Sequence, residues 1–284
     1  MFKENIHFAQ KRFESSLMFA TIKKRKKKMD KKHKIAFWVN AVFCYLIVFC
    51  STLYVTRHFF EVDILQSPYI LKTLSSVLFV LCGLFNLIYC FKTGMVKNKK
   101  FMIFMFLGLV FAMLGDVLLI DFFVVGAGLF AIGHVFFFVA FCMLSKMHWL
   151  DFVIGGGIFA VALLIIFLYK GFVFENMLPV VIAYALIISL MLGKAGGNLR
   201  LKIDKHLNFI IFFGALMFFL SDLMLLFNVF ASAPYIFDIL CLVLYYPAEF
   251  ILAFSIYFAG AHSGKEDVKI ENTDSVEIVK KEEK

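Results

Sequence analysis

The chain has 284 residues, of which 62% are hydrophobic and 17% are charged. A soluble domain cannot bury that much apolar surface, so the composition excludes a soluble globular protein and indicates a protein that lies in a membrane. The formal net charge is +9, but the basic residues gather in segments that flank the apolar runs, as the positive-inside rule expects. We therefore expect membrane lipids as partners of these segments, and no nucleic acid.

Apolar runs that could each cross a bilayer as a helix of roughly 20 residues recur along the chain. The eight runs lie at about 35–56, 69–91, 101–120, 122–143, 150–169, 177–193, 206–227 and 236–260. The sequence thus predicts an all-α polytopic membrane protein with one transmembrane domain over residues 35–262. It also predicts a basic cytoplasmic leader over residues 1–34 and, from the Lys- and Glu-rich composition, a disordered cytoplasmic tail over residues 263–284.

Lysine and arginine mark one side of the predicted bundle. Basic residues are frequent in the leader and in the loops that follow the second and sixth runs, whereas the opposite loops offer only Arg57 and Lys170. This asymmetry predicts that both termini are cytoplasmic, and an even number of spans requires the same. Both the plasma membrane and the endoplasmic reticulum fit this pattern.

Two aspartates lie inside apolar runs, each at the end of a similar phrase. These phrases are GLVFAMLGD, which ends at Asp116, and GALMFFLSD, which ends at Asp222. A carboxylate at membrane depth costs several kcal/mol unless it is paired, protonated or wetted by a cavity. The repeated phrase suggests an internal duplication into two parallel four-helix repeats. We therefore expect a polar site where the two aspartates lie.

Other polar side chains occur at compatible depths in the predicted spans, and they are Lys72, His134, Asn228, Tyr245 and Glu249. Tyr245 and Glu249 are one turn apart, so they share a helix face. Lys72 either extends to the interface or pairs with Asp116 or Asp222. His134 and the tyrosine each have a structural interpretation as well, and Asn228 is placed to cap a helix end.

A metal centre is not expected. Of the seven histidines, only His134 lies well inside a predicted span, and a membrane zinc hydrolase needs several His or carboxylate ligands around the metal. The sequence therefore predicts no metal and no other cofactor.

Four phrases resemble the YhhN-like family of membrane proteins, whose members include lysoplasmalogenases. They are LGDVLL (114–119), the glycine–histidine phrase around His134, GALMFFLSDLMLLFNVF (214–230) and LYYPAEFIL (244–252), and Lys72 matches a lysine that the family places near the start of its second helix. The resemblance covers about residues 69–260. The chain departs from the family pattern at Thr73, Phe137, Val229 and Glu249, where the family often has Pro, Tyr, a basic residue and Gln.

This resemblance implies hydrolysis of the vinyl ether bond of a lysoplasmalogen, a lysophospholipid, to a fatty aldehyde and a glycerophospho-base. Such chemistry needs a proton donor and a group that stabilises a cation or activates water, and two carboxylates in different environments can divide these roles. We hypothesise that Asp116 and Asp222 are these catalytic groups, with Lys72 holding one of them ionised and His134, Tyr245 and Glu249 positioning water or substrate. The alternative is a non-catalytic transporter or binding protein for a lipid or solute, because buried carboxylates also serve transport.

Overall fold

The computed structural model describes residues 32–56, 69–96, 98–119, 121–202, 204–231 and 233–282, with side chains described up to residue 260. Every element in these ranges is a helix. After a first helix, Lys32–Thr56, the helices are α2 (Tyr69–Thr93), α3 (Lys99–Leu118), α4 (Phe123–Leu144), α5 (Trp149–Leu168), α6 (Leu178–Asn198), α7 (Lys205–Phe230) and α8 (Ile236–Glu282). The predicted basic leader lies outside the described residues, apart from residues 32–34.

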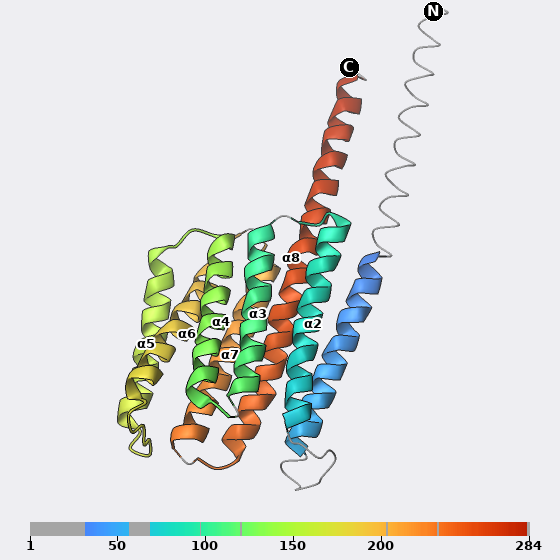
Figure 1. Cartoon of the computed structure of the whole chain (residues 1–284). Helices are drawn as coiled ribbons and strands as arrows, with labels where there is room; N and C mark the ends of the chain where they lie inside the picture. The colour runs from blue at the N-terminus through green and yellow to red at the C-terminus, as the bar shows by residue number, and fades with distance from the viewer. Residues whose placement is uncertain are drawn as a thin grey trace, which may run out of the picture. The chain divides into compact units, whose positions relative to one another are not determined.

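Eight helices of the described chain are long and apolar enough to span a membrane, and the transmembrane part of α8 ends at Gly260. This confirms the predicted all-α polytopic fold. The chain divides between Val42 and Phe43 into two units, and α2–α8 all lie in the second. In that unit the helices run side by side, and successive helices alternate in direction (Figure 1).

The two ends of the α2–α8 bundle differ in charge. One end, here the lysine-rich end, holds the α2–α3, α4–α5 and α6–α7 connections (Figure 1), and Lys99, Lys146, Lys202 and Lys205 lie there. The opposite end, the lysine-poor end, holds the α3–α4, α5–α6 and α7–α8 connections, and Lys170 lies in the second of these. Which end faces the cytoplasm remains the prediction made from the positive-inside rule.

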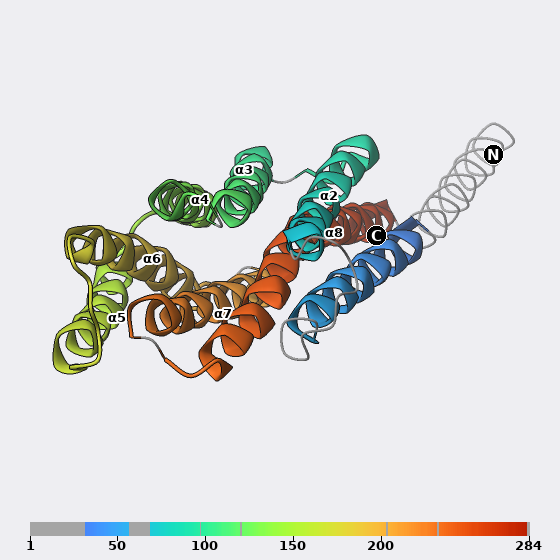
Figure 2. The same ribbon diagram turned by 60° about the horizontal axis from the view of Figure 1, so that its bottom comes forward.

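The helix pairs follow the pattern expected of two parallel repeats. α3 packs against α4 as α7 packs against α8, and α2 packs against α3 as α6 packs against α7. The contact between α2 and α8 also has a counterpart in that between α6 and α4. Exchanging α2 with α6, α3 with α7 and α4 with α8 therefore maps these contacts onto one another, as a duplicated bundle would. The contact between α3 and α8 departs from the pattern, since α7 and α4 make no corresponding backbone contact within the described helices. Figure 2 shows α5 at one edge of this arrangement, beyond α6.

The sixth span is longer than the sequence predicts. The prediction ends it at residue 193 and places Lys194 in a loop, but α6 continues to Asn198 and Lys194 is fully buried. Its Nζ lies 2.8 Å from Asp151 Oδ2 and donates to Ser145 Oγ at 3.0 Å. Arg200 Nη1 contacts the other Asp151 oxygen at 2.6 Å. Because this ion-paired cluster neutralises the lysine, the helix can continue past it.

The C-terminal segment also differs from its prediction. The sequence predicts a disordered tail from residue 263, whereas α8 continues as a helix to Glu282. Lys and Glu are good helix formers, and extending a helix that is already nucleated costs little.

Close approach of α5 and α6 depends on Gly193. A Cβ placed on Gly193 would lie 2.5 Å from both the Cα and the N of Gly155, which are backbone atoms that cannot rotate away. We expect Gly193→Ala to lower the free energy of unfolding by about 1–3 kcal/mol, because the helices must move apart. Thermal unfolding in detergent would measure this, with Gly157→Ala as the matched control, since nothing lies within 4 Å of a Cβ there. Equal melting temperatures for the two variants would contradict the interpretation.

Candidate functional site

Asp116, on α3, is held by side chains from two neighbouring helices. Lys72 Nζ, from α2, lies 3.0 Å from Asp116 Oδ1, so the lysine pairs with this aspartate. Ser76, one turn further along α2, donates to Oδ2, and the Tyr246 hydroxyl of α8 lies 3.4 Å from the same atom. The carboxylate side chain is only 5% exposed. Both of its oxygens are therefore engaged by protein groups.

Asp222, on α7, has a different set of partners. The Tyr184 hydroxyl of α6 donates to Asp222 Oδ2 at 2.7 Å, and His134 Nε2 of α4 lies 3.1 Å from the same oxygen. His134 Nε2 is also 2.9 Å from the Tyr184 hydroxyl, so the three groups form a closed triangle. Asp222 Oδ1 has no hydrogen-bond partner among the described residues. One oxygen is therefore fixed and the other is free to meet a ligand.

The two aspartate clusters occupy equivalent places in the repeat. Asp116 is bonded from α2 and α8, and Asp222 is bonded from α6 and α4. These are the helices that exchange when the two halves of the bundle are exchanged. The chemical content differs, because one cluster contains a lysine and a serine and the other contains a histidine and a tyrosine.

Aromatic rings separate the clusters. The rings of Phe130, Phe218 and Tyr245 contact one another with centroids 5.4–6.3 Å apart. The ring of Tyr245 also lies 5.0 Å from that of Tyr246, which reaches Asp116, and the ring of Phe218 lies 4.6 Å from that of His134. This aromatic wall means that the two aspartates do not share one polar chamber.

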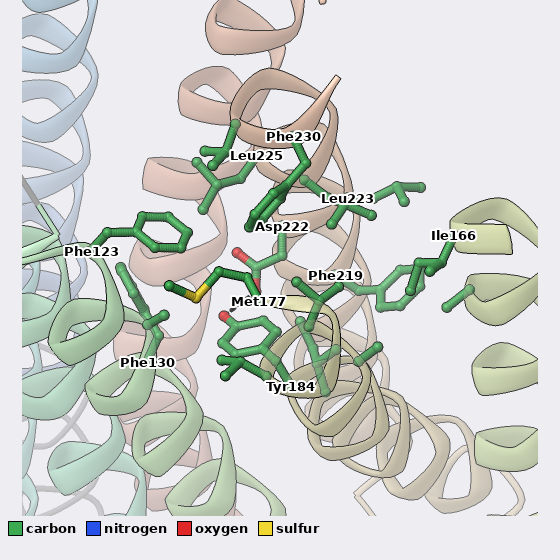
Figure 3. Close-up of a pocket in the computed structure, with 18 of the residues that line it drawn as sticks. Phe123, Phe130, Ile166, Met177, Tyr184, Phe219, Asp222, Leu223, Leu225 and Phe230 are labelled. Carbon is green, nitrogen blue, oxygen red and sulfur yellow. Dashed lines mark hydrogen bonds between the residues drawn. The ribbon is translucent and has the colours of Figure 1, made fainter. Parts of the chain in front are cut away.

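An apolar cavity opens beside Asp222. It lies between α4, α5, α6 and α7 and has a volume of about 100 Å³, which is smaller than the usual site for a drug-sized molecule, so a larger ligand requires the lining side chains to move. Asp222 and Tyr184 line it, and every other lining side chain is Ala, Val, Leu, Ile, Met or Phe. Figure 3 shows Asp222 near the middle of the lining, between Ile166 on one side and Phe123 and Phe130 on the other. Asp116 and Lys72 are not among the lining residues.

The remaining predicted residues lie in two different settings. Tyr245 and Glu249 are buried in α8, and their side-chain oxygens have no hydrogen-bond partner among the described residues. Asn228 is not brought to either cluster. Its Nδ2 donates to Asp238 Oδ1 at 3.2 Å and so joins the end of α7 to the start of α8. This hydrogen bond places Asn228 at the helix ends, and its supporting role in the site stays a prediction.

Comparison with protein families agrees with this architecture. A model of the YhhN family matches residues 67–256, which include both aspartate clusters and the transmembrane part of every helix from α2 to α7. The chain belongs to the YhhN family. Neither a curated protein nor a solved structure matches it. The match confirms the family that the sequence phrases indicated.

Two hydrogen-bonding residues of this YhhN member were missed from the sequence. Tyr184 lies in the apolar phrase VVIAYALII, where a lone tyrosine gives no signal of a polar partner. Ser76 ends the phrase YILKTLSS (69–76). A serine in a helix usually bonds its own backbone, and Ser76 does bond Lys72 O at 3.1 Å. The internal repeat gives a signal for both residues. Because α2 and α6 correspond in the repeat, Ser76, the eighth residue of α2, and Tyr184, the seventh residue of α6, lie at nearly equivalent positions.

Proposed function

We propose that this protein hydrolyses the vinyl ether bond of a lysoplasmalogen inside the membrane, with Asp222 as the group that exchanges protons with the substrate. The observation that carries the proposal is the placement of Asp222. Tyr184 and His134 bond one of its carboxyl oxygens, and the residue itself lines an otherwise apolar cavity. A lysophospholipid has one hydrocarbon chain with a reactive bond next to it, and the apolar lining of the cavity suits that chain.

The reaction consumes one water molecule. A proton from the Asp222–His134 pair adds to the vinyl carbon further from the ether oxygen, which leaves an oxocarbenium ion at the carbon bonded to that oxygen. The Asp222 carboxylate stabilises this cation and takes a proton from the attacking water. The resulting hemiacetal then collapses. Its carbon–oxygen bond to the glycerol breaks, the glycerol oxygen takes the proton, and a fatty aldehyde and a glycerophospho-base leave.

The geometry favours unequal roles for the two aspartates. Asp116 lies behind the aromatic wall, and both of its oxygens are engaged by Lys72, Ser76 and Tyr246. We therefore propose that Asp116 and Lys72 form a charged brace that fixes α2, α3 and α8, while Asp222 alone contacts the substrate. This revises the hypothesis that the two carboxylates divide the acid and base steps.

Aldehyde release tests the proposal directly. Purified protein in detergent is mixed with a 1-alkenyl lysophospholipid, with choline and with ethanolamine headgroups, and the aldehyde is measured over time. We expect aldehyde from the folded protein and none from the 1-alkyl analogue, which has no vinyl group to protonate. Absence of aldehyde from well-folded protein would contradict hydrolysis and favour a lipid-binding or transport protein that uses the same cavity.

We also expect the cavity to select substrates by the length of their alkenyl chain. Ala162 of α5 lines the cavity and is 6% exposed. Because Leu at this position would fill part of the cavity, we expect Ala162→Leu to reduce kcat/KM for long alkenyl chains relative to short ones by about tenfold or more. The ratio of aldehyde products from a mixture of two chain lengths would measure this. The exposed Ala160→Leu is the matched control, and an equal effect on both chain lengths would contradict the prediction.

A further inference from the structure

Four buried polar atoms near the site have no hydrogen-bond partner among the described residues. They are both carboxyl oxygens of Glu249, the hydroxyl of Tyr245 and Nδ1 of His134. Glu249 and His134 are fully buried, and Tyr245 is 4% exposed. None of these atoms takes part in the bonding of the two aspartate clusters. Buried polar groups are almost always satisfied, so this group of atoms needs an explanation.

The four atoms belong to one region of the bundle. Tyr245 and Glu249 are one turn apart on α8 and share a face. The ring of Phe218 on α7 lies 5.4 Å from that of Tyr245 and 4.6 Å from that of His134, so the rings of Tyr245 and His134 both pack against α7. Glu249 also lies close enough to interact electrostatically with both Asp116 and Asp222.

Burial determines the protonation state of the Glu249 carboxyl group. A carboxylate that is fully buried without a charged or hydrogen-bonded partner would cost far more than a folded protein can offset, so Glu249 is neutral. A neutral carboxyl group, a phenol and an imidazole nitrogen still lose several kcal/mol if they stay unbonded. Internal water molecules satisfy such groups, typically with about three hydrogen bonds each.

Hydrolysis needs a water molecule that the apolar cavity does not hold well, because cavities lined by apolar side chains stay dry. We propose that neutral Glu249, the Tyr245 hydroxyl and His134 Nδ1 hold internal water between α4, α7 and α8, and that this water supplies the reaction at Asp222. Glu249 is then a positioning residue that acts through water. The supply role rests on the proposed hydrolysis, whereas the bound water and the neutral carboxyl do not.

Two substitutions at Glu249 separate this role from a structural one. Gln keeps a neutral group that can donate and accept hydrogen bonds, whereas Leu has a similar size and can do neither. We expect Glu249→Gln to keep kcat near that of the unmodified protein. We expect Glu249→Leu to lower kcat by about 10- to 100-fold with KM unchanged, since water is then misplaced, and with no fall in melting temperature.

Either of two results would overturn this role. Glu249→Leu with an unchanged kcat would show that Glu249 holds no water that the reaction uses. Glu249→Gln with a loss as large as that of Glu249→Leu would show that the carboxyl group itself is needed, rather than a neutral group that binds water.

Infrared spectroscopy tests the bound water without any enzyme assay. At neutral pH we expect a carbonyl band from a protonated carboxyl group that disappears in Glu249→Gln. Tyr245→Phe should shift that band, because the two side chains share the same water. A missing band, or a band that Tyr245→Phe leaves unmoved, would overturn the water site. If the band behaves as expected but no aldehyde is released, the proposed hydrolysis fails while the water site stands.

Discussion

Replacing Asp222 by Asn is expected to reduce kcat for aldehyde release by about 100- to 10,000-fold, which is the usual contribution of a general acid or base. Asparagine is close to aspartate in size, and its carbonyl oxygen can still accept the hydrogen bond that Tyr184 donates at 2.7 Å. It cannot exchange a proton with the substrate, and it carries no charge to stabilise an oxocarbenium ion. The loss should therefore appear in kcat, while lysolipid binding changes little.

Asp121→Asn is the matched control for this variant. Asp121 is an exposed aspartate in the short connection between α3 and α4, at the same end of the bundle as the cavity, and it lies outside the cavity lining. Its substitution should leave both the rate and the melting temperature unchanged. Direct binding of a 1-alkyl lysophospholipid to Asp222→Asn would show that the cavity is intact. A folded Asp222→Asn variant with the full hydrolytic rate would refute the assigned role of Asp222.

Hydropathy and length predict the spans of this protein well, because a bilayer demands a long apolar run for every helix. The errors lie where a polar residue is neutralised by a partner distant in sequence. Lys194 is an example, because its charge marks the end of the apolar run at residue 193, whereas its partner Asp151 lies 43 positions before it. A window of sequence around Lys194 cannot reveal that ion pair.

The candidate site shows the same limit. Asp116 and Asp222 stand out in the sequence because placing a carboxylate inside an apolar helix costs free energy and is therefore rare. Their partners follow from which helices are neighbours, and the sequence left Lys72 with two possible aspartates. The structure shows that the helices that supply partners follow the internal repeat. The helix pairing that gives Asp116 its partners from α2 and α8 gives Asp222 its partners from α6 and α4. One scaffold thus holds two aspartates in matching positions but in different chemical surroundings.

The second large effect is expected on stability, when the ion pair between Lys72 and Asp116 is broken. Lys72 and Asp116 lie 3.0 Å apart with side chains only 12% and 5% exposed. Removing one member of such a pair leaves a buried charge without its partner, so we expect Lys72→Met to lower the free energy of unfolding by about 3–5 kcal/mol. Thermal unfolding in detergent would measure the loss. Lys170→Met, at an exposed lysine, is the control and should change nothing.

The double variant Lys72→Met with Asp116→Asn separates stability from catalysis. Both charges are then absent, and Asn still accepts hydrogen bonds from Ser76 and Tyr246 in place of Asp116. We expect most of the lost stability to return, since a buried ion pair contributes little over neutral groups of similar shape. If Asp116 is a brace, this variant should hydrolyse lysoplasmalogen within about tenfold of the unmodified rate. A stable double variant that loses about 100-fold or more, the size of an acid–base contribution, would show instead that Asp116 takes part in the chemistry alongside Asp222.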